Sequence, residues 1–550
     1  MSGQRSDMAP LVDLTAEPGT GPVRTRRPVY VDLLPPCNEA CPAGENIQAW
    51  LAGVTTGRNR EAWETLVSDN PLPAVHGRVC YHPCETACNR IKLDGMPVGI
   101  HAVERFLGDL AIRVRWPLPP PPTPSGKRVL IVGAGPSGLS AAYHLARHGH
   151  AVEIHEAGPL PGGMLHFGIP AYRLPRDVLL AEIRRIEAMG VKIVLGHKVE
   201  NVLAEQHAGG FHAVFVAIGA HIGRHVEIPA HDAPRMLDAL ALLRDVAAGE
   251  PPKLGRRVVV YGGGNTAMDA ARTARRLGAE TVIVYRRDRA HMPAHAFEAD
   301  EALSEGVKIR WLSTIQMIEG ETLTLEEMRL DEAGRPQPTG KVETLGADAV
   351  VLAVGQDADS RFLAGVPEVE IRPDGTVEVD AQMMTGRPGL FAGGDLVPSE
   401  RTVTVAVGHG KRAARHIHAW LRGRTVVRPA KHPVVSFEML HLPLYSDAVP
   451  AEEPALAPAA RLSGFAEVVS GLDAGEAGRE AARCLSCGNC FECDNCFAAC
   501  PEQAIEKLGP GKFYRIDLAL CTGCAVCVEQ CPCHAMEMVP EPMTAEGRAP

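Results

Sequence analysis

The 550-residue sequence predicts an α/β core with a small cysteine-rich domain at each end. Between residue 127 and about residue 421, short Val and Ile runs alternate with amphipathic helical stretches, a pattern typical of α/β folds. The 16 cysteines form two blocks, five between Cys37 and Cys88 and eleven between Cys484 and Cys533. A disulfide scaffold is usually small and secreted, so two dense blocks at the ends of a long chain indicate metal sites instead.

The composition excludes several other classes of protein. Apolar residues make up 45% and charged residues 22%, which indicates a globular chain. The net charge of −10 disfavours a sequence-independent grip on nucleic acid. The apolar runs are too short to span a bilayer, and the first residues lack the apolar stretch of a secretory signal. We therefore expect a cytoplasmic protein with no membrane span and no nucleic-acid partner.

The core begins with a strand, a glycine-rich turn and a helix. The G-x-G-x-x-G motif and the start of the helix comprise Gly133, Gly135, Pro136, Ser137 and Gly138. The glycines permit a tight turn, close approach of a pyrophosphate and packing of the helix on the strand, and the helix N-terminus faces the phosphates. The next strand, at residues 151–155, is followed by Glu156, at the distance where an acid holds a ribose hydroxyl. This unit predicts a dinucleotide site.

A second unit of the same plan follows. Its G-x-G-x-x-A motif and helix start comprise Gly262, Gly264, Asn265, Thr266 and Ala267. The strand at residues 281–285 is followed by Arg286 and Arg287, where the first unit has an acid. Losing the carboxylate and gaining guanidinium groups favours a 2′-phosphate, and thus NADPH over NADH. The alternative is that both arginines merely face solvent.

A third segment, which alone could be any strand and turn, favours a flavin as the first nucleotide once it follows two dinucleotide motifs. A short apolar strand ends in Gly-Gly-Asp, where Gly394 allows a close approach and Asp395 faces a polyol or a phosphate. Two dinucleotide sites without a motif for a phosphorylated substrate predict a flavin and a nicotinamide placed for hydride transfer. Matching strand-to-glycine segments at residues 214–220 and 350–356 predict that the second unit is inserted in the first. The core has no C-x-x-C pair, so the reduced flavin must pass its electrons to another group.

The C-terminal block contains two complete C-x2-C-x2-C-x3-C-P runs, the pattern of bacterial ferredoxins with two 4Fe–4S clusters. In this pattern the fourth cysteine of each run ligates the other cluster. One predicted ligand set is Cys490, Cys493, Cys496 and Cys531, and the other is Cys521, Cys524, Cys527 and Cys500. Cys484, Cys487 and Cys533 are left over, either as spectators or, for the first two, in a contact near the flavin domain.

The N-terminal block is less regular. Its five thiols, which suffice for one four-cysteine cluster, are Cys37, Cys41, Cys80, Cys84 and Cys88. We expect one 4Fe–4S cluster here, and a zinc site is the alternative.

The predicted fold is therefore an α/β core of two nested Rossmann-like nucleotide-binding domains, with an N-terminal α-helical iron–sulfur domain and a small C-terminal α+β ferredoxin-like domain. Six prolines between Pro117 and Pro124 predict a stiff linker before the core. The predicted divisions are an extended arm (1–36), the helical domain (37–116), the linker (117–126), the FAD domain (127–220 and 357–425), the NAD(P) domain (221–356), a second linker (426–483), the ferredoxin domain (484–540) and a tail (541–550).

From about residue 37 to residue 421 the sequence resembles the small subunit of bacterial glutamate synthase and the N-terminal half of dihydropyrimidine dehydrogenase. The resemblance depends on the segments GRVCYHPCETAC, VLIVGAGPSGLSAA, PGGMLHFGIPAYRLP, GGGNTAMDAARTARRLGA, VYRRDRAHMPA and FAGGD. It implies FAD in the first site, with Gly163 and Met164 beside it, and NAD(P)H in the second. It also implies that a helical iron–sulfur domain carries electrons toward a partner.

The sequence departs from this family in two places. Relatives with two N-terminal clusters have a further C-x2-C before the position of Cys37, so we expect that one cluster has been lost. The resemblance implies that the surviving cluster is held by Cys41, Cys80, Cys84 and Glu104, and an all-cysteine set with Cys37 or Cys88 competes with it. The ferredoxin domain is an addition, similar to that of flavoproteins in dissimilatory sulfite reductase systems, and related subunits serve 2-oxoacid oxidoreductases.

These observations predict an iron–sulfur flavoprotein that transfers electrons between NAD(P)H and a protein partner within a hetero-oligomer. We nominate no catalytic side chain, because hydride transfer between nicotinamide and flavin needs positioning and a tuned potential rather than an acid or a base. One alternative is a stand-alone flavin enzyme that reduces a small organic substrate. Another is a non-catalytic assembly subunit with vestigial nucleotide sites.

Overall fold

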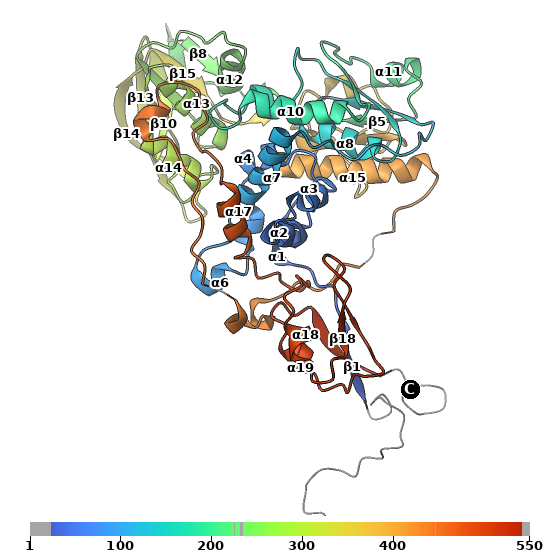
Figure 1. The fold of residues 1–550 in the computed structure, drawn as a ribbon. Coiled ribbons are helices and arrows are strands. Elements are labelled where there is room, and N and C mark those ends of the chain that lie inside the picture. The colour runs from blue at the N-terminus through green and yellow to red at the C-terminus, as the bar shows by residue number, and fades with distance from the viewer. Residues whose placement is uncertain (1–23, 225, 232–234, 428–429, 446, 542–550) are drawn as a thin grey trace, which may run out of the picture.

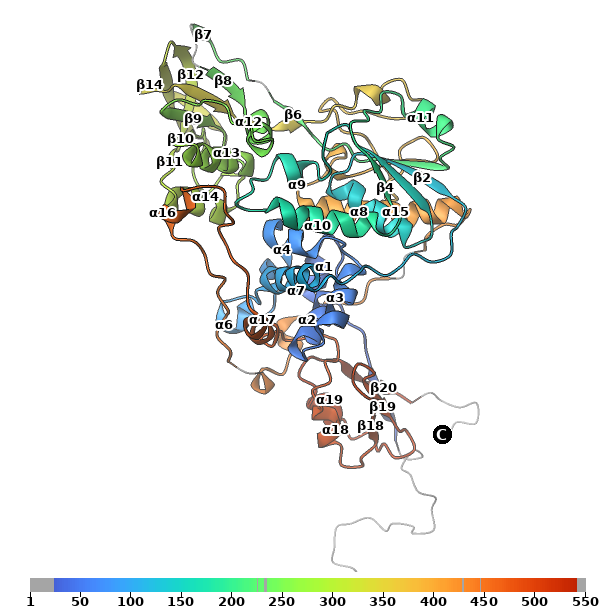
Figure 2. The same cartoon turned by 45° about the horizontal axis from the view of Figure 1, so that its top comes forward.

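The computed structural model describes residues 24–541 except residues 225, 232–234, 428–429 and 446. Figure 1 shows two α/β lobes at the top, a helical domain below them and a small C-terminal domain at the bottom, and the turned view in Figure 2 keeps this order. Residues 1–23 of the predicted arm and residues 542–550 of the predicted tail lie outside the described residues.

The first lobe is built on a five-stranded parallel sheet. The strand order is β17 (Leu390–Ala392), β5 (Ala213–Val216), β2 (Arg128–Val132), β3 (Ala151–His155) and β4 (Lys192–Val194). Its helices are α8 (Pro136–Ala146), α9 (Met164–Phe167), α10 (Arg176–Glu187), α11 (Val202–Ala208) and α15 (Val403–Leu421). Apart from Arg128, the residues of β2 are buried, as expected for a central parallel strand that is covered on both faces.

The second lobe is a further five-stranded parallel sheet, which confirms the α/β core. Its strands run in the order β11 (Lys308–Arg310), β10 (Glu280–Val284), β9 (Arg257–Tyr261), β15 (Ala349–Leu352) and β8 (Arg235–Asp238). Its helices are α12 (Ala239–Ala247), α13 (Asn265–Arg276) and α14 (Ala296–Ser304). Where the chain passes between the lobes, β6 (Ile222–Gly223) pairs with β16 (Gln356–Asp357), and β17 then joins the first sheet beside β5.

A four-stranded sheet that the sequence did not predict packs on this second lobe. It runs β14 (Pro336–Gly346), β13 (Thr322–Leu330), β12 (Ser313–Glu319) and β7 (Ala230–His231). One face is apolar because Ile315, Leu323 and Leu325 pack against Val259 and Val350 of the parallel sheet. The other face is polar, so a strand such as β13 alternates buried and exposed residues and lacks the continuous apolar run of a strand in the parallel sheets.

The N-terminal domain is helical, as predicted. Its helices are α1 (Pro36–Ala40), α2 (Ile47–Thr55), α3 (Asn59–Val67), α4 (Pro73–Val79), α5 (Pro83–Thr86), α6 (Ile91–Asp94) and α7 (Ile100–Val114). A helix from the predicted second linker, α17 (Ala474–Ala481), completes its core by packing on α2 and α7. Ala477 and Ala481 are fully buried there, which the short Ala-rich stretch alone did not indicate.

The C-terminal domain consists of two short helices and three strands. They are α18 (Asn495–Ala499), β18 (Ile505–Lys507), β19 (Tyr514–Ile516), α19 (Val526–Glu529) and β20 (Met536–Pro540). Part of the predicted arm forms β1 (Arg26–Tyr30), which pairs antiparallel with β20. The first described strand of the chain therefore belongs to the last domain.

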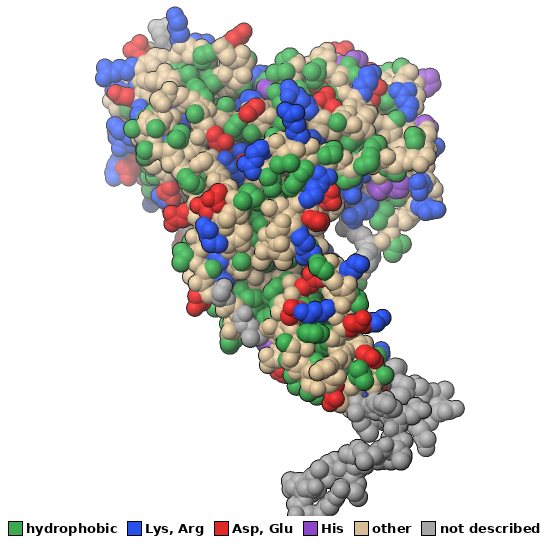
Figure 3. All heavy atoms as spheres, viewed as in Figure 1, with side chains coloured by type: hydrophobic (Ala, Val, Ile, Leu, Met, Phe, Trp, Pro, Cys, Tyr) green, Lys and Arg blue, Asp and Glu red, His purple; other side chains and the backbone are tan. Residues whose placement is uncertain are grey.

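Two surface properties bear on partners. On the face drawn in Figure 3, basic and acidic side chains are interspersed rather than gathered in one basic stripe. Among the helices of the described residues, none is long and apolar enough to cross a membrane.

Candidate redox centres

One large cavity of about 1590 Å³ is lined by residues of both lobes. It exceeds the roughly 300–1,000 Å³ of an ordinary ligand pocket, so it has room for two dinucleotides. The predicted nucleotide-binding residues that line it are Gly133, Gly135, Pro136, Ser137, Glu156, Gly163, Met164, Gly262, Gly264, Asn265, Thr266, Arg286, Arg287, Gly394 and Asp395. Gly138 and Ala267 do not line it, because they lie where each helix packs on its strand.

The first glycine turn is shaped for a phosphate. Gly133 has φ +104°, and a Cβ there would lie 2.5 Å from the carbonyl oxygen of Ala217. A Cβ on Gly135 would meet nothing within 4 Å, so the backbone is open to the cavity. The Ser137 hydroxyl at the start of α8 is buried without a hydrogen-bond partner among the described residues. This orphaned donor and the uncapped helix N-terminus fit a pyrophosphate.

Two carboxylates flank this turn. Glu156 accepts hydrogen bonds from the N–H groups of Ala134 and Gly158, each at 2.7 Å, and so joins the turn after β2 to the loop after β3. Burial raises the pKa of Asp395 to about 6, against the opposing effect of Arg401. Both side chains line the cavity, as predicted for groups that face a ribose or a polyol.

The second turn is similar. A Cβ on Gly262 would lie 2.2 Å from the carbonyl oxygen of Ala353, and a Cβ on Gly264 would be free. Arg286 is exposed and Arg287 half-buried, and both line the cavity rather than only facing solvent. The Nε of Arg287 is buried with no hydrogen-bond partner among the described residues.

The structure divides the five N-terminal thiols into two groups. The first contains Cys41, Cys80 and Cys84 together with Glu104. Burial raises the pKa of the Cys41 thiol well above its usual range, and nearby Glu45, Glu104 and Cys80 raise it further. The Glu104 carboxylate is buried and accepts a hydrogen bond from Asn70 Nδ2 at 2.9 Å. Cys84 is close to both Cys80 and Cys41, so the four groups of the ligand set implied by the resemblance are neighbours.

This first group borders the nucleotide cavity. Val79 and Tyr81, on either side of Cys80, line that cavity. The Thr404 hydroxyl, at the start of α15, donates a hydrogen bond to Cys80 Sγ at 2.9 Å. Thr404 carried no sequence signal, because its role arises only where α15 meets the helical domain.

Cys37 and Cys88 belong to the second group, with Cys484 and Cys487. Burial raises the pKa of the Cys37 thiol well above its usual range. The nearby thiols of Cys484, Cys88 and Cys487 raise this pKa further. All four cysteines line one cavity of about 20 Å³. The pair that the sequence left unassigned thus lies in the helical domain, beside thiols from the other end of the chain.

The ferredoxin-like domain brings its cysteines together in the predicted crossed sets. Burial raises the pKa of Cys490 to about 12, with added effects of Cys496, Cys493 and Cys531. The other set, Cys500, Cys521, Cys524 and Cys527, lines a cavity of about 20 Å³. Cys533 is buried 3.8 Å from Cys531, measured between the sulfur atoms.

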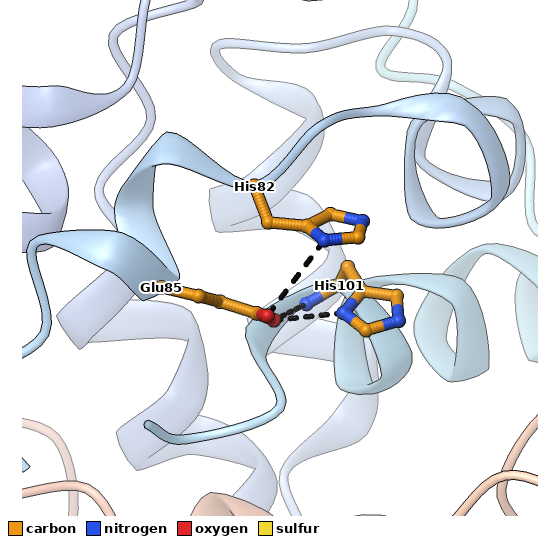
Figure 4. A group of neighbouring side chains, drawn as sticks. All are labelled: His82, Glu85 and His101. Carbon is orange, nitrogen blue, oxygen red and sulfur yellow. Dashed lines mark hydrogen bonds and ion pairs between the residues drawn. The ribbon is translucent and has the colours of Figure 1, made fainter. Parts of the chain in front are cut away.

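A cluster of polar side chains that the sequence did not reveal lies beside α5, the helix that carries Cys84. Figure 4 shows the Glu85 carboxylate beside the imidazoles of His82 and His101, which stack on each other. His101 Nδ1 lies 2.8 Å from Glu85, and its Nε2 lies 3.0 Å from Glu453. Burial lowers the pKa of His101, but the two carboxylates outweigh burial and raise it to about 10. The resulting imidazolium holds α5 to α7 and to the segment before α17.

Known proteins match the chain in all three parts. Residues 127–410 match the pyridine nucleotide-disulphide oxidoreductase family, residues 32–116 the 4Fe-4S domain II of dihydropyrimidine dehydrogenase, and residues 489–535 a 4Fe-4S dicluster domain. The chain is 38% identical to the NADP(+)-dependent formate dehydrogenase subunit beta of Moorella thermoacetica, over 82% of this chain and 70% of that protein.

Two further relatives carry other names. The NADPH-Fe(3+) oxidoreductase subunit beta of Geobacter sulfurreducens is 34% identical over 82% of this chain and 75% of its own length. The small chain of the NADPH glutamate synthase of Azospirillum brasilense is 32% identical over 71% of this chain and 87% of its own length. The resemblance to glutamate synthase small subunits and the presence of both iron–sulfur domains are thereby confirmed.

Proposed function

The chain belongs to the pyridine nucleotide-disulphide oxidoreductase family, and we propose that it is the subunit of a larger complex that exchanges electrons between NADPH and a protein partner. It is an NAD(P)H-dependent oxidoreductase with iron–sulfur domains. Despite the family's name, the sequence has no cysteine between Cys88 and Cys484, so no redox disulfide serves the flavin.

The observation that carries this proposal is the position of Cys80. The cavity that both glycine turns line is also lined by the two neighbours of Cys80. A group held by Cys41, Cys80, Cys84 and Glu104 would therefore adjoin the flavin. When bound, FAD takes a hydride from NADPH and releases its two electrons one at a time, which suits iron–sulfur acceptors.

The chain's own residues then have distinct tasks. The first turn, with Glu156, Gly163, Met164 and Asp395, binds FAD, and the second turn binds the nicotinamide nucleotide. Arg286 and Arg287 select NADPH by its 2′-phosphate. Residues 221–356 form the NADPH domain inserted in the FAD domain, and β6 pairs with β16 where the chain crosses.

The remaining cysteines extend the path away from the flavin. The ferredoxin domain holds two 4Fe–4S clusters, one on Cys490, Cys493, Cys496 and Cys531 and the other on Cys500, Cys521, Cys524 and Cys527. Cys524 is exposed, so the second cluster is the exit to the partner. The relatives named as formate dehydrogenase and Fe(3+) oxidoreductase subunits support a protein partner that exchanges electrons.

Anaerobic stopped-flow spectroscopy of the purified chain tests this function. We expect NADPH to bleach the flavin band first, and reduced clusters to appear afterwards in the EPR spectrum. Reduced methyl viologen should drive the reverse reaction, since ferredoxin-type clusters have potentials near roughly −400 mV. A flavin that NADPH reduces while every cluster stays oxidised would contradict a relay and favour the stand-alone flavin enzyme.

A further inference from the structure

We propose that Cys37, Cys88, Cys484 and Cys487 hold a further 4Fe–4S cluster, so that the chain carries four clusters. The N-terminal block by itself has five thiols, which suffice for only one four-cysteine cluster. The fold adds two thiols from the other end of the chain. The C-x2-C pair that relatives have before the position of Cys37 is thereby replaced by Cys484 and Cys487.

The four cysteines surround a cavity that resembles the one between cysteines of the ferredoxin domain. Its volume, about 20 Å³, equals that of the cavity lined by Cys500, Cys521, Cys524 and Cys527 in the ferredoxin domain. Apolar side chains complete the wall, among them Leu51, Val98 and Ile100. Such a wall excludes water, and burial of this kind is one of the factors that set the potential of a cluster.

The thiols are held from three separate parts of the fold. Cys37 lies on α1, Cys88 follows α5, and Cys484 and Cys487 lie just after α17. The Gln48 amide donates to the Ser486 hydroxyl at 3.1 Å, which fixes the loop between Cys484 and Cys487. Both cysteines also accept hydrogen bonds at sulfur, from the Ser486 N–H at 3.4 Å and from Asn89 Nδ2 at 3.5 Å. Donors to sulfur are the groups that tune a cluster.

Two buried arginines tie the parts of this site together. Arg90 is 1% exposed, lines the same cavity and pairs with Asp94 at 2.7 Å. Arg483, next to Cys484, is fully buried and pairs with Glu480 at 2.6 Å and with Asp94 at 3.4 Å. Asp94 therefore joins the segment after Cys88 to the segment before Cys484.

The position also suits a relay. On one side Cys37 is a neighbour of Cys84, which belongs to the group beside the nucleotide cavity. On the other side the Gly488 N–H, next to Cys487, donates to the carbonyl of Cys533 at 2.6 Å, at the edge of the ferredoxin domain. This group therefore lies between the flavin side and the ferredoxin side. Its role as the link between them rests on the proposed function, whereas the ligand set does not.

Metal analysis of the anaerobically purified full chain tests the ligand set. We expect about sixteen iron and sixteen sulfide ions per chain, and about twelve of each in the Cys484→Ser/Cys487→Ser variant. The Cys37→Ser/Cys88→Ser variant should also retain only about twelve iron and twelve sulfide ions per chain. Combining the four substitutions should cause no further loss, because both pairs serve one site. Cys533→Ser, a buried cysteine of the same block outside every ligand set, should keep all the iron.

Three results would overturn the proposal. These are about twelve iron ions in the unmodified chain, one equivalent of zinc beside about twelve iron, or full iron in the Cys484→Ser/Cys487→Ser variant. If a variant also loses FAD and is misfolded, the count in the unmodified chain decides. NADPH should still reduce the flavin in a folded variant, while EPR signals of the ferredoxin clusters appear more slowly. Failure of NADPH to reduce the flavin at all would instead refute the proposed function.

Discussion

The nucleotide lobes and the ferredoxin-like domain build their candidate cofactor sites from different groups, backbone turns in the lobes and cysteine side chains in the small domain. The lobes form their site from backbone turns that follow strands such as β2 and β9, which are buried apart from their first residues. The ferredoxin-like domain has a core cluster of eight buried residues, of which four are cysteines: Cys496, Cys527, Cys531 and Cys533. The comparison teaches that the lobes build their cavity on apolar strands, whereas thiols suited to bind metal make up half of the buried core of the small domain.

The largest expected effect is therefore that of iron removal. A core in so small a domain rarely supplies more than about 3–5 kcal/mol, and unligated thiols supply less. After chelation under oxidising conditions we expect residues 489–541 to lose hydrogen-exchange protection, while the sheets at residues 128–216 and 235–352 keep theirs. Hydrogen exchange with mass spectrometry measures both in one sample. Equal loss in the lobes would show that they also depend on the clusters.

A substitution in the first turn should abolish flavin binding without touching the metal. In Gly133→Ala the left-handed φ costs about 1–3 kcal/mol, and the Cβ also strikes the carbonyl of Ala217. Gly126→Ala is a matched control, because Gly126 has φ +73° but open space around it. We expect Gly133→Ala to be purified with iron but without FAD, and Gly126→Ala to keep both. Flavin absorbance and iron assays decide, and a full flavin content in Gly133→Ala would contradict the turn's role.

Nucleotide selection should respond less strongly. If Arg287 binds the 2′-phosphate as proposed, Arg287→Ala removes a charge-assisted contact worth about 1.5–3 kcal/mol, so kcat/KM for NADPH should fall about 10-fold or more. The value for NADH should stay the same. Arg289→Ala is the control, since Arg289 pairs with Asp300 at 2.6 Å and does not line the cavity. Equal losses with both nucleotides would mean that Arg287 merely supports the fold.

The smallest expected effect is at the contact between the first lobe and the helical domain. Thr404→Val removes the hydroxyl that donates to Cys80 Sγ, so a cluster held by Cys80, as proposed, would lose a hydrogen bond that stabilises its reduced state. We expect the potential of that cluster to fall by about 20–60 mV, the equivalent of 0.5–1.5 kcal/mol. The ferredoxin clusters of the same chain serve as the internal control in an EPR redox titration. A potential that stays constant, or a uniform shift of all clusters, would refute a direct contact.

Local motifs made part of the molecule predictable. Gly133 and Gly262 could be read from the sequence because strand, turn and helix are adjacent in the chain, and the crossed pairing of Cys500 and Cys531 follows from a spacing rule. The resemblance, rather than spacing, indicated Glu104, and the structure places it beside Cys41. The sheet of β12 to β14 was not predicted. Its alternating apolar residues pack on the second lobe, and this contact exists only in the folded chain.

The sequence by itself determined which motifs are present: two dinucleotide-binding turns, two ferredoxin cysteine runs and a cysteine-free core between two cysteine blocks. Tertiary structure decided which parts meet. It seats α17 in the helical domain, pairs β1 with β20, and brings Cys484 and Cys487 to Cys37 and Cys88. The physical reason is that a glycine turn is fixed by neighbouring peptide units, whereas a cysteine ligand contributes one atom at the end of a side chain. The packing of buried surfaces decides which cysteines meet, and this packing cannot be read from the spacing of cysteines along the chain.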